Sequence, residues 1–146
     1  MNFGPPRQVL TQGPLYPAAK GYAGYASPAG IVRDGGIDLF YSVAHVRRGA
    51  DPEWQQVAIH HARSTDGLHF REDAAPLLTR ASTSWTDGEI LAPGPLLDGG
   101  TLKLWFGGHV ANARLGPLLQ RGVRGPEFGI GLATVSLTST RKGAKP

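Results

Sequence analysis

Short runs of apolar and aromatic residues, each bounded by a glycine-containing turn, recur along the chain. The run "ASPAGIVRDGGIDLFYS" at residues 26–42 lies without a gap over "LAPGPLLDGGTLKLWFG" at residues 91–107, an offset of 65 residues. No window keeps the 3.6-residue apolar period of an amphipathic helix. The pattern therefore predicts consecutive antiparallel strands, with inner strands near residues 28–33 and 93–97.

The second strand of each unit is apolar on both of its faces. Large side chains occupy alternate and intervening positions in residues 37–43 and again in residues 102–106. Such a strand has to be covered on both sides, as happens where small sheets stack face to face. We therefore expect Phe40 with Tyr41, and Trp105 with Phe106, to be mostly buried.

A repeat of about 65 residues that holds three or four strands has the size of a propeller blade. An immunoglobulin-like sandwich offers similar strands but not this fixed offset. The sequence thus predicts an all-β, partial propeller domain over residues 1–146. Blade one spans about residues 20–75, blade two spans about residues 85–136 and lacks its outermost strand, and residues 137–146 form a basic tail.

Three phrases carry a family resemblance: "AIHHARSTDGLHF", "SWTDGEILAPGPLLDGGTLKLWFGG" and "GIGLATVS". Together they resemble the five-bladed β-propeller glycosidases, the arabinanase, levansucrase and invertase group that includes glycoside hydrolase families 43 and 32. There, A-x-S-x-DG-x-x-F/W closes one blade and P-x-x-x-x-x-G-x-x-x-L-W/Y opens the next. The resemblance covers about residues 20–136. It implies a partial five-bladed propeller, a carbohydrate ligand and, if any reaction, hydrolysis of a glycosidic bond.

Glycoside hydrolysis usually needs two carboxyl groups. The resemblance implies carboxylates on the inner strands, one or two positions before a proline. Here those positions hold Ala26 and Ser27, and Leu91 and Ala92. Two interpretations stay open: a glycoside hydrolase-like protein that is incomplete as a single chain or depends on oligomer formation, or a non-catalytic carbohydrate-binding or structural module that self-associates.

Glu89 is the candidate catalytic residue, with Asp87 beside it in "WTDGEILAP". The resemblance places this segment at the rim of the pocket, with Trp85 as an apolar platform for a sugar ring. His45 and His109 follow the second strand of their units at nearly equivalent positions and are candidate substrate-binding residues. The alternative for Glu89 is a loop carboxylate, and for the histidines a cap for loop backbone.

The other acidic residues have structural interpretations. Asp38 aligns with Lys103, which predicts a solvent-facing strand position. Glu72 and Asp73 are expected in loops, without an evident partner. Aspartates that precede glycine are typical of tight turns; they are Asp34, Asp66, Asp87 and Asp98.

The composition of the chain restricts the classes of partner and cofactor that we expect. The net charge is +4, from 15 basic and 11 acidic residues. The tail "RKGAKP" has no aromatic residue on which bases could stack, which favours a solvated tail over nucleic-acid binding. Cysteine is absent, and the adjacent His60 and His61 point to opposite faces of a strand. We therefore expect no metal and no cofactor.

The first ten residues lack the features of a secretory signal, and nowhere do about 18 apolar residues run together. We therefore expect a cytoplasmic protein without a membrane partner. Two unclosed blades should expose two wide apolar faces, and large exposed apolar patches generally mark an interface. Self-association is therefore expected.

Overall fold

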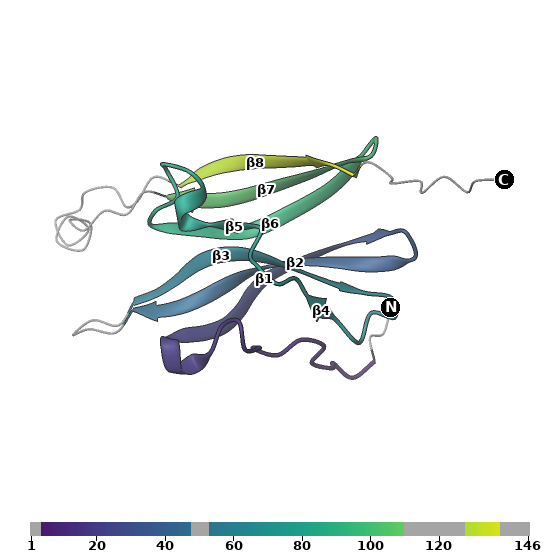
Figure 1. Cartoon of the computed structure of the whole chain (residues 1–146), viewed down its shortest axis with the longest axis horizontal. Coiled ribbons are helices and arrows are strands. Elements are labelled where there is room, and N and C mark those ends of the chain that lie inside the picture. Colours follow the sequence, from purple (N-terminus) through teal and green to yellow (C-terminus); the bar gives the residue numbers. More distant parts are fainter. Residues whose placement is uncertain (1–3, 48–52, 110–127, 138–146) are drawn as a thin grey trace.

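The computed structural model describes residues 4–47, 53–109 and 128–137, which form two antiparallel sheets stacked face to face (Figure 1). Sheet 1 contains β1 (Tyr22–Arg33), β2 (Gly36–Arg47) and β3 (Glu53–Ser64), with β4 (Arg71–Glu72) and β5 (Leu78–Thr79) both paired to β3. Sheet 2 contains β6 (Glu89–Asp98), β7 (Thr101–His109) and β8 (Gly129–Ser136). The 3-10 helices η1 (Ala18–Lys20) and η2 (Arg80–Ser82) flank them.

The all-β prediction is confirmed, and the predicted inner strands lie within β1 and β6. Within the ranges described, neither helix is long and apolar enough to cross a membrane.

The sequence repeat reappears as a repeat of backbone conformation. The β1–β2 hairpin turns at Asp34 and Gly35, with φ of 48° and 68°, and the β6–β7 hairpin turns at Gly99 and Gly100, with φ of 53° and 80°. Two successive left-handed residues form the tight loop whose twist matches that of the flanking strands. In both hairpins the second strand therefore leaves the turn with the same orientation relative to the first strand.

A second repeated feature lies inside the first strand of each sheet. Ser27 has a φ of 51° and Ala92 has a φ of 52°, and the strand pairing shifts register at both places. The left-handed conformation costs a residue with a Cβ atom roughly 1–2 kcal/mol. Its recurrence 65 residues apart shows that the bulge belongs to the repeated unit and is not an accident of one strand.

Apolar side chains from both sheets form one core between them. Phe40 and Ile59 from sheet 1 pack against Ile90, Leu104 and Phe106 from sheet 2. All five are buried, with Phe40 only 2% and Phe106 only 4% exposed. The predicted burial is confirmed for these two aromatic residues.

The outer face of sheet 1 is covered by the N-terminal segment, residues 4–21, which runs beneath it in Figure 1. Tyr16 packs there against Tyr41 and Val43, and Tyr41 is 1% exposed. The expectation of two open apolar faces is therefore wrong for this sheet, because the chain's own N-terminal segment packs on its outer face.

Glu72 in β4 is hydrogen-bonded to side chains of β1 and β2 on this side of sheet 1. Its Oε1 accepts hydrogen bonds of 2.6 Å from the hydroxyls of Tyr25 and Tyr41, so the expectation that Glu72 lacks a partner is wrong. Burial and the bond to Glu72 raise the pKa of Tyr25 to about 12. The partners lie 47 and 31 residues away in the sequence and meet the carboxylate only once β4 pairs with β3.

Trp105 departs from the predicted burial, with 37% of its surface exposed. Its position in sheet 2 is equivalent to that of Phe40 in sheet 1, by the 65-residue offset. Sheet 2 covers Phe40, but no described residue forms a layer over the outer face of sheet 2. The two residues occupy equivalent strand positions, and they differ in burial because only Phe40 has a second sheet packed over it.

These positions predict unequal costs of truncation. Phe40→Ala should lower the free energy of unfolding by about 3 to 5 kcal/mol, because it opens a cavity between the sheets. Trp105→Ala should cost less than half as much. Urea denaturation of the two variants checks this, and equal losses would contradict the stacking described here.

Candidate functional site

Glu89 and His109 face each other at one end of sheet 2. They are the first residue of β6 and the last residue of β7, and they pair directly in the register. Glu89 Oε2 lies 3.4 Å from His109 Nε2, and Glu89 Oε1 accepts a 2.7 Å hydrogen bond from the backbone N–H of Gln56 in β3. Both sheets therefore position this carboxylate, whose side chain keeps 17% of its surface exposed.

Polar contacts also fix the chain that leads to Glu89. Arg80 donates from Nη1 to Gln55 Oε1 at 3.0 Å and to the carbonyl of Gly88 at 3.3 Å. The buried Thr86 hydroxyl donates to the Arg80 carbonyl at 2.9 Å. Because these bonds hold η2 and the following turn together, the approach to β6 has a defined path.

The arrangement supports polar recognition. An ionised carboxylate is an acceptor of hydrogen bonds, and the part of Glu89 left exposed is available to a hydroxyl-rich ligand. Asp87 stands two residues earlier, in the exposed turn before β6. Within the described ranges, no group of three or more His, Asp or Glu side chains is placed to hold a metal ion.

His45 lies near the end of β2, close to the strand segment of β3 that contacts Glu89. It pairs with Gln55 in the β2–β3 register, one residue from Gln56. Its Nε2 lies 3.1 Å from the carbonyl of Lys20, and its ring meets Tyr22 edge-on at 5.2 Å. The contact the structure provides for His45 thus caps loop backbone, and a sugar contact stays a prediction.

Trp85 packs against the core. Its ring stacks on Phe106 at 5.7 Å between centroids, with 12° between the planes. A Cβ atom at Gly131 would lie 2.7 Å from the indole and one at Gly129 would lie 3.2 Å from it, so glycine in β8 makes room for this ring. Packing is the role that the contacts show, and the predicted sugar platform stays a prediction.

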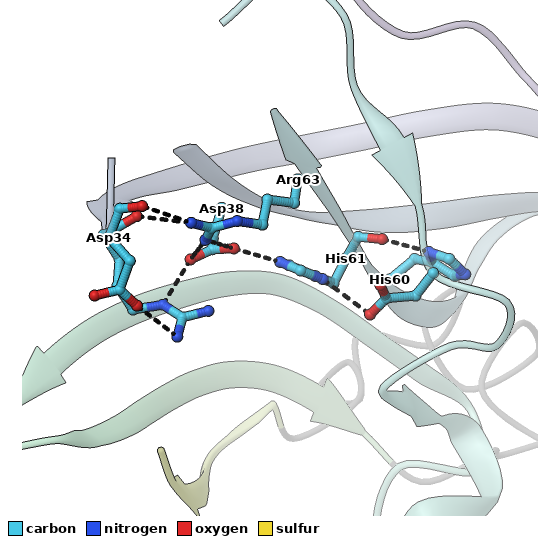
Figure 2. Close-up of polar contacts among 7 residues, drawn as sticks. Asp34, Asp38, His60, His61 and Arg63 are labelled. Atoms are coloured by element: carbon cyan, nitrogen blue, oxygen red, sulfur yellow. Dashed lines mark hydrogen bonds and ion pairs between the residues drawn. The ribbon is translucent and has the colours of Figure 1, made fainter. Parts of the chain in front are cut away.

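The sequence interpretation missed a charged cluster around Asp38 (Figure 2). Asp38 is 1% exposed and receives hydrogen bonds from Arg33 Nε at 2.8 Å and from Arg63 Nη1 at 2.8 and 2.9 Å. The expectation of a solvent-facing position is wrong. The equivalent Lys103 is on the open face of sheet 2, whereas the face that carries Asp38 lies against sheet 2.

His61 joins two carboxylates in this cluster. Its Nε2 lies 3.0 Å from Asp38 Oδ1 and its Nδ1 lies 2.9 Å from Asp73 Oδ2, so the expectation that Asp73 has no partner is wrong. Because carboxylates only accept, both contacts are hydrogen bonds when the ring carries both protons. Burial would raise the pKa of Asp38, but the bonds from Arg33, Arg63 and His61 outweigh it and hold this pKa at about 2.

The Asp38 cluster therefore fastens β1, β2 and β3 at the end opposite to Glu89, with its charges paired among themselves. His60 lies on the other face of β3, as predicted, with its Nδ1 3.2 Å from the Tyr41 hydroxyl. Burial lowers the pKa of His60. The side chains of the two adjacent histidines therefore make separate contacts on opposite faces of β3.

Comparison with known proteins identifies the fold. No protein-family profile matches the chain, and no curated protein matches it in sequence. Among solved structures, it is similar to a GH43_1 enzyme from Xanthomonas citri complexed with xylotriose, at 19% identity and a TM-score of 0.55, over 77% of this chain and 28% of the enzyme.

Two further structures agree. CoXyl43, a GH43 β-xylosidase/α-arabinofuranosidase from a compost metagenome, is 18% identical with a TM-score of 0.56, over 77% of this chain and 31% of CoXyl43. A putative glycosidase from Bacteroides thetaiotaomicron is 16% identical with a TM-score of 0.53, over 77% and 29%. The fold is that of the β-propeller glycosidases, and the chain spans less than a third of the length of these proteins.

The depressed pKa of Asp38 predicts an acid-labile contribution to stability. Because this pKa is about 2, below the ordinary 3.8, the contribution is complete above about pH 4 and is lost as the pH falls towards 2. At pH 6 the free energy of unfolding of the native chain should be at least roughly 2 kcal/mol larger than that of Asp38→Asn. The excess should shrink between about pH 4 and pH 2.

Denaturant titrations across this pH range measure the difference. Asp34→Asn is the matched control. Asp34 is exposed, and the arginine that its side chain contacts is Arg33. A difference in unfolding free energy between the native chain and Asp38→Asn that does not change with pH would contradict the role assigned to the carboxylate.

Proposed function

We propose that this chain is a glycosidase-like β-propeller module that binds carbohydrate at the end of the sheets where Glu89 and His109 meet. The observation that carries the proposal is the Glu89 carboxylate, which is held by Gln56 and His109 and yet remains partly accessible. Structures with the same fold support a sugar ligand, because the Xanthomonas citri enzyme was solved with xylotriose and with xylose.

Catalysis by this segment alone is not part of the proposal. The positions before Pro28 and Pro93 carry no carboxyl group, although the backbone bulges are present there. Hydrolysis needs an acid and a base or nucleophile at a fixed separation. In our proposal Glu89, with Asp87, takes part in hydrolysis only where a second copy of the chain or a longer polypeptide completes the pocket.

The roles within the site follow from the contacts. Glu89 accepts hydrogen bonds from sugar hydroxyls, and His109, whose ring meets Phe128 edge-on at 4.8 Å, offers a second polar contact beside an aromatic surface. Trp85 and His45 border the same end of the sheets. Self-association is part of the proposal, because the outer face of sheet 2 is apolar and exposed.

The alternative function is a non-catalytic binding or structural module. The absence of carboxylates at residues 26–27 and 91–92 favours it. Aryl furanosides and pyranosides discriminate between the two functions. Hydrolysis that disappears in Glu89→Gln, with folding retained, supports the enzyme, whereas sugar binding without turnover supports the alternative.

Binding of xylotriose is the direct test. Titration calorimetry should detect binding to the native chain, and Glu89→Gln should weaken it by about 10- to 100-fold, as expected when a hydrogen bond to a charged group is lost. Asp34→Asn, at the opposite end of the sheets, should leave the affinity unchanged. Equal affinities of the native chain and Glu89→Gln would remove Glu89 from the site.

A further inference from the structure

The outer face of sheet 2 carries a contiguous apolar patch. The register puts Gly94, Trp105 and Leu132 side by side on this face, with Ile130 beside Gly107 and Leu96 beside Lys103. Four of these side chains are large, apolar and exposed: Leu96 at 48%, Trp105 at 37%, Ile130 at 83% and Leu132 at 51%. We call these four residues the sheet 2 patch.

The internal repeat shows what such a face is built to contact. Ile31 and Phe40 of sheet 1 are equivalent to Leu96 and Trp105 by the 65-residue offset, and both belong to the core against sheet 2. The sheet 2 patch is therefore the same surface, one unit later, without a described layer over it.

The outer edges of β3 and β8 differ in the part of the chain that the structure describes. In sheet 1, the outer edge of β3 pairs with β4 and β5. Over the described ranges, β8 pairs with β7 alone. Its sequence "GIGLATVS" contains no charged residue and no proline. Charged residues and proline are what commonly prevents an edge strand from pairing with another chain.

We propose that β8 and the sheet 2 patch form the interface between two copies of this chain. The proposal rests on the self-association in the proposed function and names its surface. Head-to-tail stacking would require the outer face of sheet 1 in the second copy, which the N-terminal segment already covers. The surface left is the patch itself, so like surfaces meet about a two-fold axis.

The geometry of that contact follows from the exposed face. The two patches pack face to face, so that sheet 2 of one copy stacks on sheet 2 of the other about 10 Å away. Charge does not oppose it, because Lys103 and Asp98, which flank the patch, form an ion pair with each other. Three strands of about eight residues offer roughly 400 Å² per copy, which is below the standard size and predicts a weak dimer.

Sedimentation velocity between about 1 and 500 µM tests the proposal, since a small interface implies micromolar affinity or weaker. The native chain should shift from monomer to dimer over this range. Ile130→Lys should remain a monomer, because it puts a charge into the interface of both copies. Val32→Lys is the matched control: Val32 is 79% exposed on β1, and this variant should dimerise like the native chain.

A spin label locates the contact. The chain has no cysteine, so Thr134→Cys carries a single label on β8, and Asp34→Cys carries one at the far hairpin of sheet 1. The two Thr134 labels of a dimer should lie within roughly 20 Å of each other, since stacked sheets pack about 10 Å apart. The two Asp34 labels should lie farther apart than the Thr134 labels.

Three results overturn the proposal: a native chain that is monomeric throughout, a dimer that persists in Ile130→Lys, or Thr134 labels that lie farther apart than the Asp34 labels. Xylotriose binding to the native chain, measured on the same sample as its mass, separates this inference from the proposed function. A native chain that binds the sugar but stays monomeric overturns only the interface, whereas a native dimer that fails to bind it overturns only the carbohydrate site.

Discussion

The stacking of two sheets through Phe40 and Ile59 on one side and Ile90, Leu104 and Phe106 on the other is the interaction on which the rest of the structure depends. Removing apolar surface from water supplies the main driving force for such packing. It also sets the polar contacts between the sheets. The backbone N–H of Gln56 reaches Glu89 only in this arrangement, and the N–H of Ala92 meets the Ser42 hydroxyl at 3.0 Å.

Features that depend on neighbours in the sequence could be predicted, and features that depend on distant layers could not. The strands, the hairpin turns and the repeat follow from local alternation and from glycine pairs. Phe40 and Trp105 look alike in the sequence, as do Asp38 and Lys103 by position. Their burial differs because a second sheet lies over one member of each pair, and no local pattern records which faces become covered.

The candidate site was predictable to the same extent. The position of Glu89 just before an inner strand, and of His109 at the end of the next strand, followed from the repeat, and antiparallel pairing brings them together. The Asp38 cluster was missed because the 65-residue offset places Asp38 over Lys103, which suggested a solvent-facing position. The repeat does not record that a second sheet covers the face that carries Asp38 and leaves the face that carries Lys103 exposed.

The two left-handed residues, Ser27 and Ala92, make the fold a starting point for protein engineering. Aspartate and asparagine adopt this conformation more readily than most residues with a side chain. A carboxylate at either position would thus suit the existing backbone better than a residue of low left-handed preference such as Ala92 does. The resemblance drawn from the sequence implies acidic residues at these same positions next to proline. Because both bulges are already present in the backbone, an acidic group could be introduced at one of these positions at a time.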